Sequence, residues 1–355
     1  MSDFQKQLKT LLPELMRSPR LYPHSLDMEK GTALVFEADQ DFYRNAIFLD
    51  QRVLTEGTKG AWVPLQVLWD QVRAGQGGRV APANFIFHTG HCGSTLISRL
   101  LDEVPSVLGL REPLALRTLA VGHNVRETLP GGAYEDTFSL TYQLLSRRFS
   151  PEQQVIIKAT SMCNNLGSLL LSKNSANRGL LLFVTLEIYL TNMLDKKETP
   201  DIEGFFKHRL AGLEKRVPEL EINFAEMTKP EKIAFSWLAE AAELADLAGG
   251  REKQQVLLMD FDQFLKEREI HLELIFNHFN LPGEEEALAR MQASPVFNDY
   301  AKQPGFAFNA ENRVAILKES RAANKEAIDK GIAFVEGLMK THTSLASISE
   351  KLPLI

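Results

Sequence analysis

The sequence is poor in cysteine and in long apolar runs. It contains only two cysteines, Cys92 and Cys163, in 355 residues, which excludes a disulfide framework and offers no zinc-ligand spacing. No segment reaches the roughly 18 consecutive apolar residues of a membrane-spanning helix. The opening sequence MSDFQKQLKTLLPEL lacks the charged-then-apolar layout of a signal peptide. We therefore expect a reduced, cytoplasmic protein with no membrane partner.

The sequence also lacks an excess of positive charge. Lysine and arginine number 40 against 46 aspartates and glutamates, a formal net charge of −6, which argues against a general nucleic-acid binder. Internal repeats and low-complexity tracts are absent as well. What is present is an ordinary globular composition, 44% hydrophobic and 24% charged, from which a sizeable core can be built. The composition indicates no oligomeric state.

From Asn84 onward, short apolar runs alternate with longer helical stretches, which is the pattern of a parallel α/β sheet covered by helices on both faces. The predicted strands are 85–88, 106–110, 155–159, 180–185 and 256–261. A helical region spans 187–248, with interruptions near 199–200 and 229–230. These elements predict an α/β fold with a central parallel sheet.

Both ends of the chain depart from this pattern. Residues 1–27 have the periodicity of an amphipathic helix followed by an irregular stretch. Short strands and a turn are expected within 31–54, and a helix within 63–74. After Pro282 the chain is polar, and 311–340 is predicted to form one long amphipathic helix. We therefore divide the chain into an N-terminal cap (1–80), a central α/β domain (81–283) and a helical extension (284–355).

The segment FIFHTGHCGSTLISRLLD (85–102) combines a buried strand, a glycine loop and a helix in that order. Gly90 and Gly93 let the backbone turn tightly and approach a ligand. The first N–H groups of the helix have no intrahelical acceptor and carry the positive end of the helix dipole. A phosphate or sulfate is expected to bind there, with Ser94 and Thr95 adding hydroxyl donors. The alternative is a tight turn whose glycines serve packing only.

The nucleotide-triphosphate motif GxxxxGK[ST] does not fit this loop. Gly93 stands directly before Ser94, where that motif places the lysine that contacts the phosphates. A Mg-bound triphosphate would lose its usual cation, which disfavours a nucleotide kinase.

The run HTGHCGSTLISRLLDEVPSVLGLREP (88–113) resembles the 5′-phosphosulfate-binding region of sulfotransferases that use 3′-phosphoadenosine 5′-phosphosulfate (PAPS), in the bacterial and tyrosylprotein sulfotransferase branch. Residues 92–95 match the second half of the family's loop, and His91 stands where the family has lysine or arginine. The run 256–282 resembles a late strand and helix of that family. The resemblance implies a P-loop three-layer sandwich with no metal. It implies that PAPS is bound by Gly90, His91, Cys92, Gly93, Ser94 and Thr95.

The resemblance also implies three catalytic residues. In the branch named above, a glutamate after the second strand takes the proton of the acceptor, and Glu112 has a comparable position. Lys158 ends a strand where similar sequences carry a lysine. Glu112 would then act as base, while His91 and Lys158 stabilise charge. The alternatives are that Glu112 only complements a helix dipole and that Lys158 forms a structural ion pair.

For the 3′-phosphate, the family has an arginine after the fourth strand and a serine about two helical turns later. This sequence has no arginine there, and Thr185 and Asn192 are the nearest candidates. Other side chains are assigned structural positions: Asp50 and Arg52 as an ion pair, and Asp262 as a helix cap. Arg111 is expected to be either a solvated neighbour of the site or a ligand.

The sequence thus predicts a PAPS-dependent sulfotransferase that acts on an acceptor hydroxyl or amine of a small molecule or peptide. Two other functions stay open. One is a non-catalytic protein of the same fold that binds a phosphorylated ligand, which the missing cations favour. The other is a nucleotide or small-molecule kinase.

Overall fold

The computed structural model describes residues 3–75, 80–128, 132–298 and 310–355. Its central sheet has five parallel strands in the order β5-β6-β4-β7-β8. The strands are β4 (Asn84–His88), β5 (Val107–Arg111), β6 (Gln154–Lys158), β7 (Gly179–Phe183) and β8 (Val256–Asp260). Every residue of β4, β5 and β7 is buried, because apolar runs of this kind need cover on both faces of the sheet.

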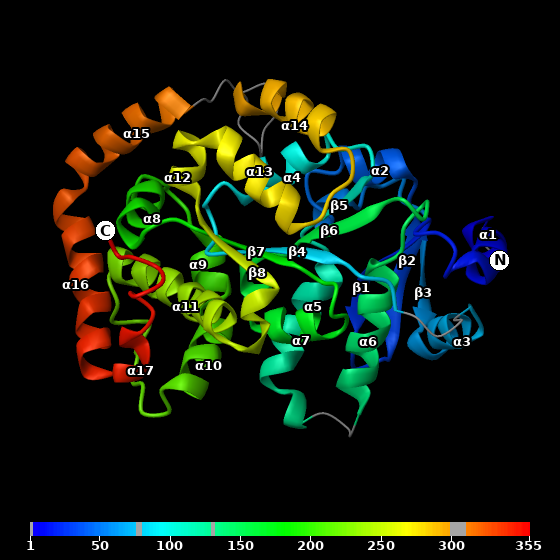
Figure 1. Cartoon of the computed structure of the whole chain (residues 1–355). Coiled ribbons are helices and arrows are strands. Elements are labelled where there is room, and N and C mark those ends of the chain that lie inside the picture. Colours follow the sequence, from blue (N-terminus) through cyan, green and yellow to red (C-terminus); the bar gives the residue numbers. More distant parts are fainter. Residues whose placement is uncertain (1–2, 76–79, 129–131, 299–309) are drawn as a thin grey trace.

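Helices cover both faces of this sheet (Figure 1). On one face lie α4 (Ser94–Leu101), α13 (Arg268–His278) and α14 (Glu284–Ala293). On the other lie α5 (Leu114–Asn124), α6 (Ala133–Leu145), α7 (Gly167–Ser172) and α11 (Lys229–Gly249). The remaining helices of this region are α8 (Leu186–Leu194), α9 (Pro200–Gly204), α10 (Phe206–Arg216) and α12 (Phe261–Lys266). A capping box of Thr228 and Glu231 starts α11, which explains the predicted interruption near Pro230.

Strand β4 occupies the middle of the sheet. It is hydrogen-bonded to β6 on one side and to β7 on the other. The chain first builds the β5–β6 side and then crosses to β7 and β8, so strand order reverses beside β4. In open parallel sheets, ligands bind at the carboxyl ends of the strands at such a reversal. The loop after β4 lies at this point.

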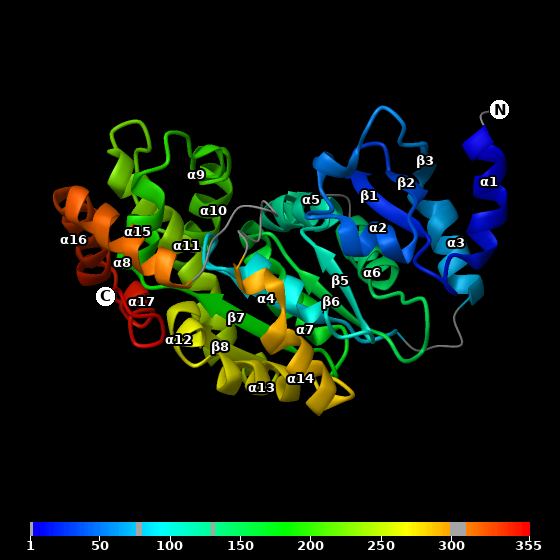
Figure 2. The ribbon, with the colours of Figure 1, turned by 90° about the horizontal axis from the view of Figure 1, so that it is seen from above.

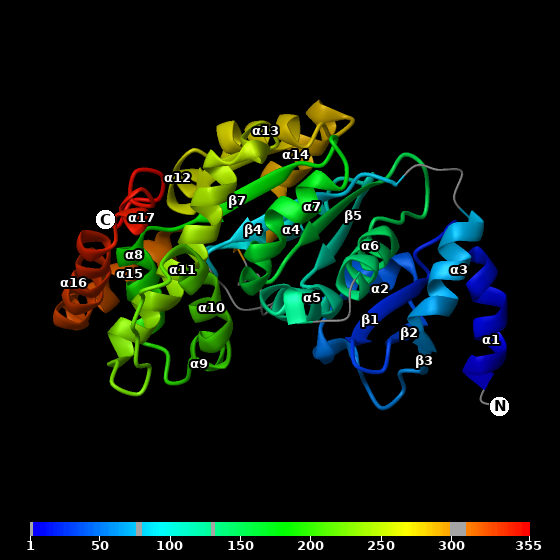
Figure 3. The same ribbon diagram turned by 90° about the horizontal axis from the view of Figure 1, so that it is seen from below.

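The N-terminal residues form a separate antiparallel sheet, β1-β2-β3. Its elements are α1 (Asp3–Leu11), β1 (Leu21–Asp27), β2 (Thr32–Glu37), α2 (Gln40–Asn45), β3 (Gly60–Pro64) and α3 (Leu65–Gly75). Figure 3 shows α5 and α6 between this sheet and the central one, and both helices contact β1. The prediction of an irregular stretch after the first helix was wrong, because Leu21–Asp27 pairs along β2.

Two buried arginines attach the N-terminal sheet to the rest of the molecule. Arg111 of β5 donates to the carbonyls of Tyr43, Arg44 and Ala46 at 2.7–3.0 Å and is ion-paired with Asp102. Arg147, after α6, donates to the carbonyls of residues 15, 18 and 21. The expectation that Arg111 is a solvated neighbour or ligand of the site was therefore wrong, since only 2% of it is exposed.

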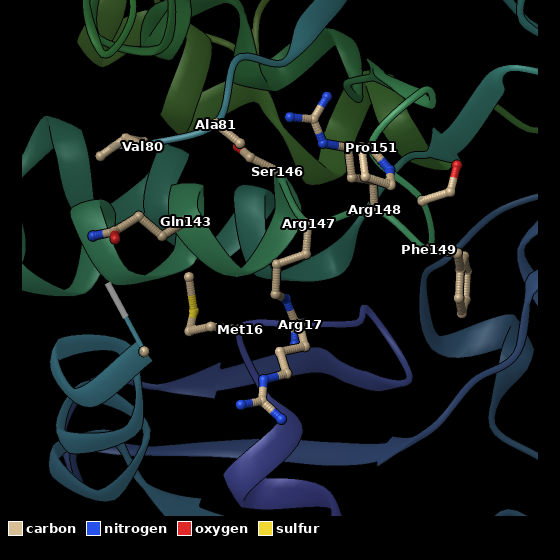
Figure 4. A pocket seen from close by; sticks show the side chains of 12 residues that line it. Met16, Arg17, Val80, Ala81, Gln143, Ser146, Arg147, Arg148, Phe149 and Pro151 are labelled. Atoms are coloured by element: carbon tan, nitrogen blue, oxygen red, sulfur yellow. The ribbon is translucent and has the colours of Figure 1, made fainter. Parts of the chain in front are cut away.

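A pocket of about 330 Å³ lies beside this second attachment, between the N-terminal segment and α6. Figure 4 shows Met16 and Arg17 on one side of it and Gln143 and Ser146 on the other. Its lining includes Ala81, which precedes β4, and Pro151, which precedes β6. The pocket therefore lies where the central strands begin, at the opposite edge of the sheet from the glycine loop.

The C-terminal residues form α15 (Ala310–Ala323), α16 (Lys325–Thr341) and α17 (Thr343–Ala346). Figure 2 shows α15 and α16 at the end of the central sheet opposite the N-terminal sheet. The prediction of one helix over 311–340 was wrong, because the chain breaks at Asn324, whose side chain donates to Asp195 at 2.7 Å.

The predicted α/β fold class with a central parallel sheet is confirmed. The division at 80 and 283 stays a prediction. No helix among the described residues is long and apolar enough to cross a membrane.

Candidate active site

The glycine loop turns through backbone conformations that few residues adopt. Gly90, His91 and Gly93 all have positive φ angles, of 80°, 48° and 76°. Gly93 caps α4, and a Cβ at this position would overlap the ring of Phe261. Glycine is therefore required at 93 by conformation and by space. His91 is not a glycine, so its positive φ strains the backbone. Strain of this kind is common at functional sites.

At the start of α4, several polar hydrogens have no acceptor among the described residues. No side chain caps α4, and the first of its amides with a backbone acceptor is that of Ile97, which donates to Gly93. Thr95 is 2% exposed, and its hydroxyl has no hydrogen-bond partner in the described part of the chain. The hydroxyls of Thr89 and Thr160, which follow β4 and β6, are buried and unpartnered in the same way. Unpaired donors at a helix N-terminus fit an anion.

A buried histidine holds the start of the loop. His88 Nδ1 accepts from the amide of Gly90 at 2.9 Å, and its Nε2 lies 3.0 Å from the carbonyl of Ala159. Asn164 binds the backbone of His88 at both its N–H and its C=O. These bonds join the ends of β4 and β6, so the loop has a rigid base.

Glu112 and Lys158 lie together at the ends of the neighbouring strands β5 and β6. Their side chains form an ion pair, and the amide of Glu112 donates to the carbonyl of Lys158 at 2.7 Å. The side chain of Lys158 is 1% exposed and that of Glu112 is 14% exposed. Glu112 also has a positive φ of 54°. The structure therefore brings these two predicted residues together, and the predicted ion pair of Lys158 is formed with the predicted base.

The N-terminal segment reaches this pair. Arg52 lies 3.9 Å from Glu112 Oε2 and 2.6 Å from Asp50, which confirms the predicted Asp50–Arg52 ion pair. The ring of Phe48 lies 3.9 Å from the Arg52 guanidinium and 5.5 Å from Lys158 Nζ. Burial alone would raise the pKa of Asp50, but hydrogen bonds from Arg52 hold this pKa below its ordinary value. Residues 48–52 thus form one wall beside Glu112.

His91 contacts side chains from a distant segment, beyond α8. Its Nδ1 lies 2.9 Å from Lys196 Nζ, and its Nε2 lies 2.8 Å from Asp201 Oδ2. Burial acts to raise the pKa of Asp201, but its hydrogen bond and electrostatic interaction with His91, together with the charge of Arg209, bring it well below its ordinary value. Asp201 is therefore ionised. The side chain of His91 thus contacts one lysine and one carboxylate.

The two residues predicted near the 3′-phosphate lie at α8. Thr185 caps this helix, its hydroxyl oxygen accepting from the amide of Ile188 at 3.3 Å. The side-chain nitrogen of Asn192 is buried and has no partner among the described residues. Arg321 of α15 pairs with Glu187 and Arg313 with Asp262. The prediction that Asp262 caps α12 was wrong. The cap is Asp260, whose side chain accepts from two amides of that helix.

Lys196, Asp201 and Arg52 were not assigned to the site from the sequence. Lys196 and Asp201 are 105 and 110 positions from His91, in a region where the pattern indicates only helices and breaks. Arg52 was predicted as a partner of Asp50 alone. No local motif marks them, because their proximity depends on how α8 and the N-terminal segment pack.

Neither a family model nor a curated protein sequence matches the chain. Solved structures to which it is similar include the sulfotransferase domain of the curacin biosynthetic pathway, at 13% identity and a TM-score of 0.39 over 78% of this chain and 98% of that one. Sulfotransferase STF9 of Mycobacterium avium is similar at 13% identity and 0.38, over 81% and 92%. Mouse sulfotransferase SULT7A1, complexed with PAP, is similar at 10% identity and 0.38, over 76% and 88%. All three of these solved structures are of sulfotransferases.

Proposed function

We propose that the chain transfers a sulfuryl group from PAPS to an acceptor hydroxyl or amine. The observation that carries the proposal is the set of unpaired donors at the start of α4, together with the Glu112–Lys158 pair at the adjacent strand ends. The amides of the loop, the Ser94 hydroxyl and the Thr95 hydroxyl would bind the 5′-phosphosulfate. Thr95 can do so without giving up a bond within the protein.

The transfer needs a proton acceptor and a positive charge. Glu112 would take the proton of the attacking hydroxyl or amine as its oxygen or nitrogen bonds to sulfur. Lys158 would stabilise negative charge on the sulfuryl group or on the phosphate oxygen, from which the sulfur departs as PAP is released. Both side chains are largely buried, where a charge interaction is weakened less by solvent.

The other end of PAPS would lie toward α8. Asn192 has two N–H donors without partners in the described chain, and the Thr185 hydroxyl can still donate while it accepts from Ile188. These groups fit a phosphate, although they supply no charge of their own.

A non-catalytic binding protein is the second candidate. It is favoured by the ion pairs of Glu112 with Lys158 and Arg52, which already engage the carboxylate that the transfer would need as a proton acceptor.

Radiolabelled sulfuryl transfer from PAPS to a panel of alcohols, phenols and amines tests the proposal. We expect turnover, and we expect Glu112→Gln to lower kcat by about 10²- to 10⁴-fold while PAP binding stays within about twofold. Glu135→Gln, an exposed carboxylate of α6, is the control. PAP binding with no turnover over the panel would favour the second candidate. Absence of PAP binding would contradict the proposal that the chain uses PAPS.

A further inference from the structure

We infer that Lys196 supplies the positive charge of the loop's anion site and that His91 acts as its neutral holder. This inference rests on the proposed function for the identity of the anion. It concerns the position at which the family loop has lysine or arginine and this chain has histidine.

Two hydrogen bonds of His91 indicate which of its ring nitrogens carries a proton. An ammonium group can only donate, so Lys196 Nζ donates to Nδ1 of His91, 2.9 Å away. The ring proton must then be on Nε2, which donates to Asp201 at 2.8 Å. A protonated imidazole would place an N–H against the ammonium. This pair of hydrogen bonds matches a neutral imidazole, with the lysine as the cation beside the loop.

Each end of this hydrogen-bonded series is anchored independently. Arg209 donates to the backbone carbonyl of Asp201 at 2.8 Å and forms a buried ion pair with Glu240. At the other end, Lys196 Nζ contacts Met193 Sδ at 3.1 Å. The backbone carbonyl of Lys196 accepts from Lys229 at 2.8 Å. Lys196 is thus held at the end of α8, facing the loop.

The charges also favour an anion at this position. The negative charge of Asp201 offsets the charge of Lys196 only across the imidazole, because the two groups contact opposite nitrogens of the ring. The ammonium adds to the partial positive charge at the N-terminus of α4. The ring of His91, a residue with a strained φ of 48°, lies between these two groups.

Calorimetric titration with PAP and, separately, with inorganic pyrophosphate tests the inference. Lys196→Met should weaken binding about 10- to 100-fold, and Lys196→Arg should keep most of the affinity. Adding His91→Lys to Lys196→Met moves the cation onto the loop and should restore binding. Lys197→Met, at an exposed neighbouring lysine, should bind as the parent does, and thermal melts identify any variant that fails to fold.

The outcomes separate the inference from the proposed function. If the parent binds PAP and Lys196→Met binds it equally well, the inference is wrong and the proposed function stands. If the parent binds pyrophosphate but not PAP, the proposed function is wrong, and the pyrophosphate affinity of Lys196→Met decides the inference. Absence of binding of either anion to the parent overturns both. If Lys196→Met does not fold, failure of the double variant to bind while folded overturns the inference.

Discussion

Gly93 is the residue on which the shape of the loop depends most. It has a left-handed φ of 76°, and a Cβ added there would overlap the ring of Phe261. Gly283 is a matched reference, because it caps α14 at a φ of 75° and a Cβ there would meet nothing within 4 Å. The two glycines have nearly the same φ but differ in the space available to a side chain.

We therefore expect Gly283→Ala to lower the free energy of unfolding by about 1 kcal/mol, the strain of a left-handed alanine. Gly93→Ala should lower it by about 2 to 4 kcal/mol, because displacing Phe261 adds to the same strain. Urea unfolding of both variants measures the difference. Equal losses would mean that Phe261 does not pack on the loop.

Glu243 of α11 gives the molecule a pH-dependent stability. Burial, with the negative charges of Asp246 and Glu240, raises the pKa of Glu243 from 4.5 to about 7, against the opposing charge of Arg216. Between these values the folded chain holds a proton that the unfolded chain has released. Stability contributed by the neutral carboxyl is therefore lost as pH rises from about 4.5 to about 7.

The uncharged variant Glu243→Gln should not lose this stability. We expect its melting temperature to exceed that of the parent at pH 8 and to match it at pH 5, because the parent carboxyl is neutral at the lower pH. Thermal melts across this range measure the effect. A constant difference between the two chains at all pH values would show that another property of the substitution is responsible.

At the residue scale, the sequence predicts local features of the candidate site and misses distant ones. Residues 90–95 are recognisable because strand, glycines and helix follow one another along the chain. Glu112 and Lys158 are recognisable because polar residues end apolar strands. Lys196 has no such signal, since it comes to His91 only through the packing of α8.

At the scale of the elements, burial decides what could be predicted. The five central strands are apolar runs covered on both sides, and each was predicted within about two residues of its bounds. Strand β1 was missed because Pro23, His24 and Ser25 interrupt its apolar pattern, and a bulge lies there. The break between α15 and α16 was missed because Asn324 is stabilised by Asp195 of another element.

Helix α16 packs closely on α8 and α11, and two of its glycines test this packing. A Cβ at Gly331 would lie 2.8 and 2.9 Å from Leu190 and 3.2 Å from the carbonyl of Pro230. A Cβ at Gly337 would meet nothing within 4 Å. Both positions are helical, so alanine is favoured by propensity at each, and only the space differs.

We expect Gly337→Ala to stabilise the chain by about 0.5 to 1 kcal/mol through helix propensity. Gly331→Ala should destabilise it by about 1 to 3 kcal/mol, because the added methyl overpacks a buried contact. Chemical unfolding of the two variants gives the comparison. Stabilisation by both alanines would mean that α16 is not seated on α8.

At the scale of the whole molecule, the three parts meet around one edge of the central sheet. The sheet provides the loop, Glu112 and Lys158. The N-terminal segment brings Arg52 to Glu112, while α15 contributes an ion pair to α8 through Arg321. A site of this kind is completed only when all three parts are folded together.

Thr95 allows the most direct test of the central claim, which is that the loop binds the phosphosulfate end of PAPS. Its buried hydroxyl has no partner in the described chain, so Thr95→Val removes no hydrogen bond within the protein. We expect the variant to be as stable as the parent or up to about 1 kcal/mol more stable.

The measurement is a calorimetric titration of the full chain and of Thr95→Val with PAP, under identical conditions. We predict saturable binding at one site to the parent and binding about tenfold weaker to the variant, as expected for one lost hydrogen bond to a charged group. No binding to the parent, or equal binding to both chains, would contradict the claim.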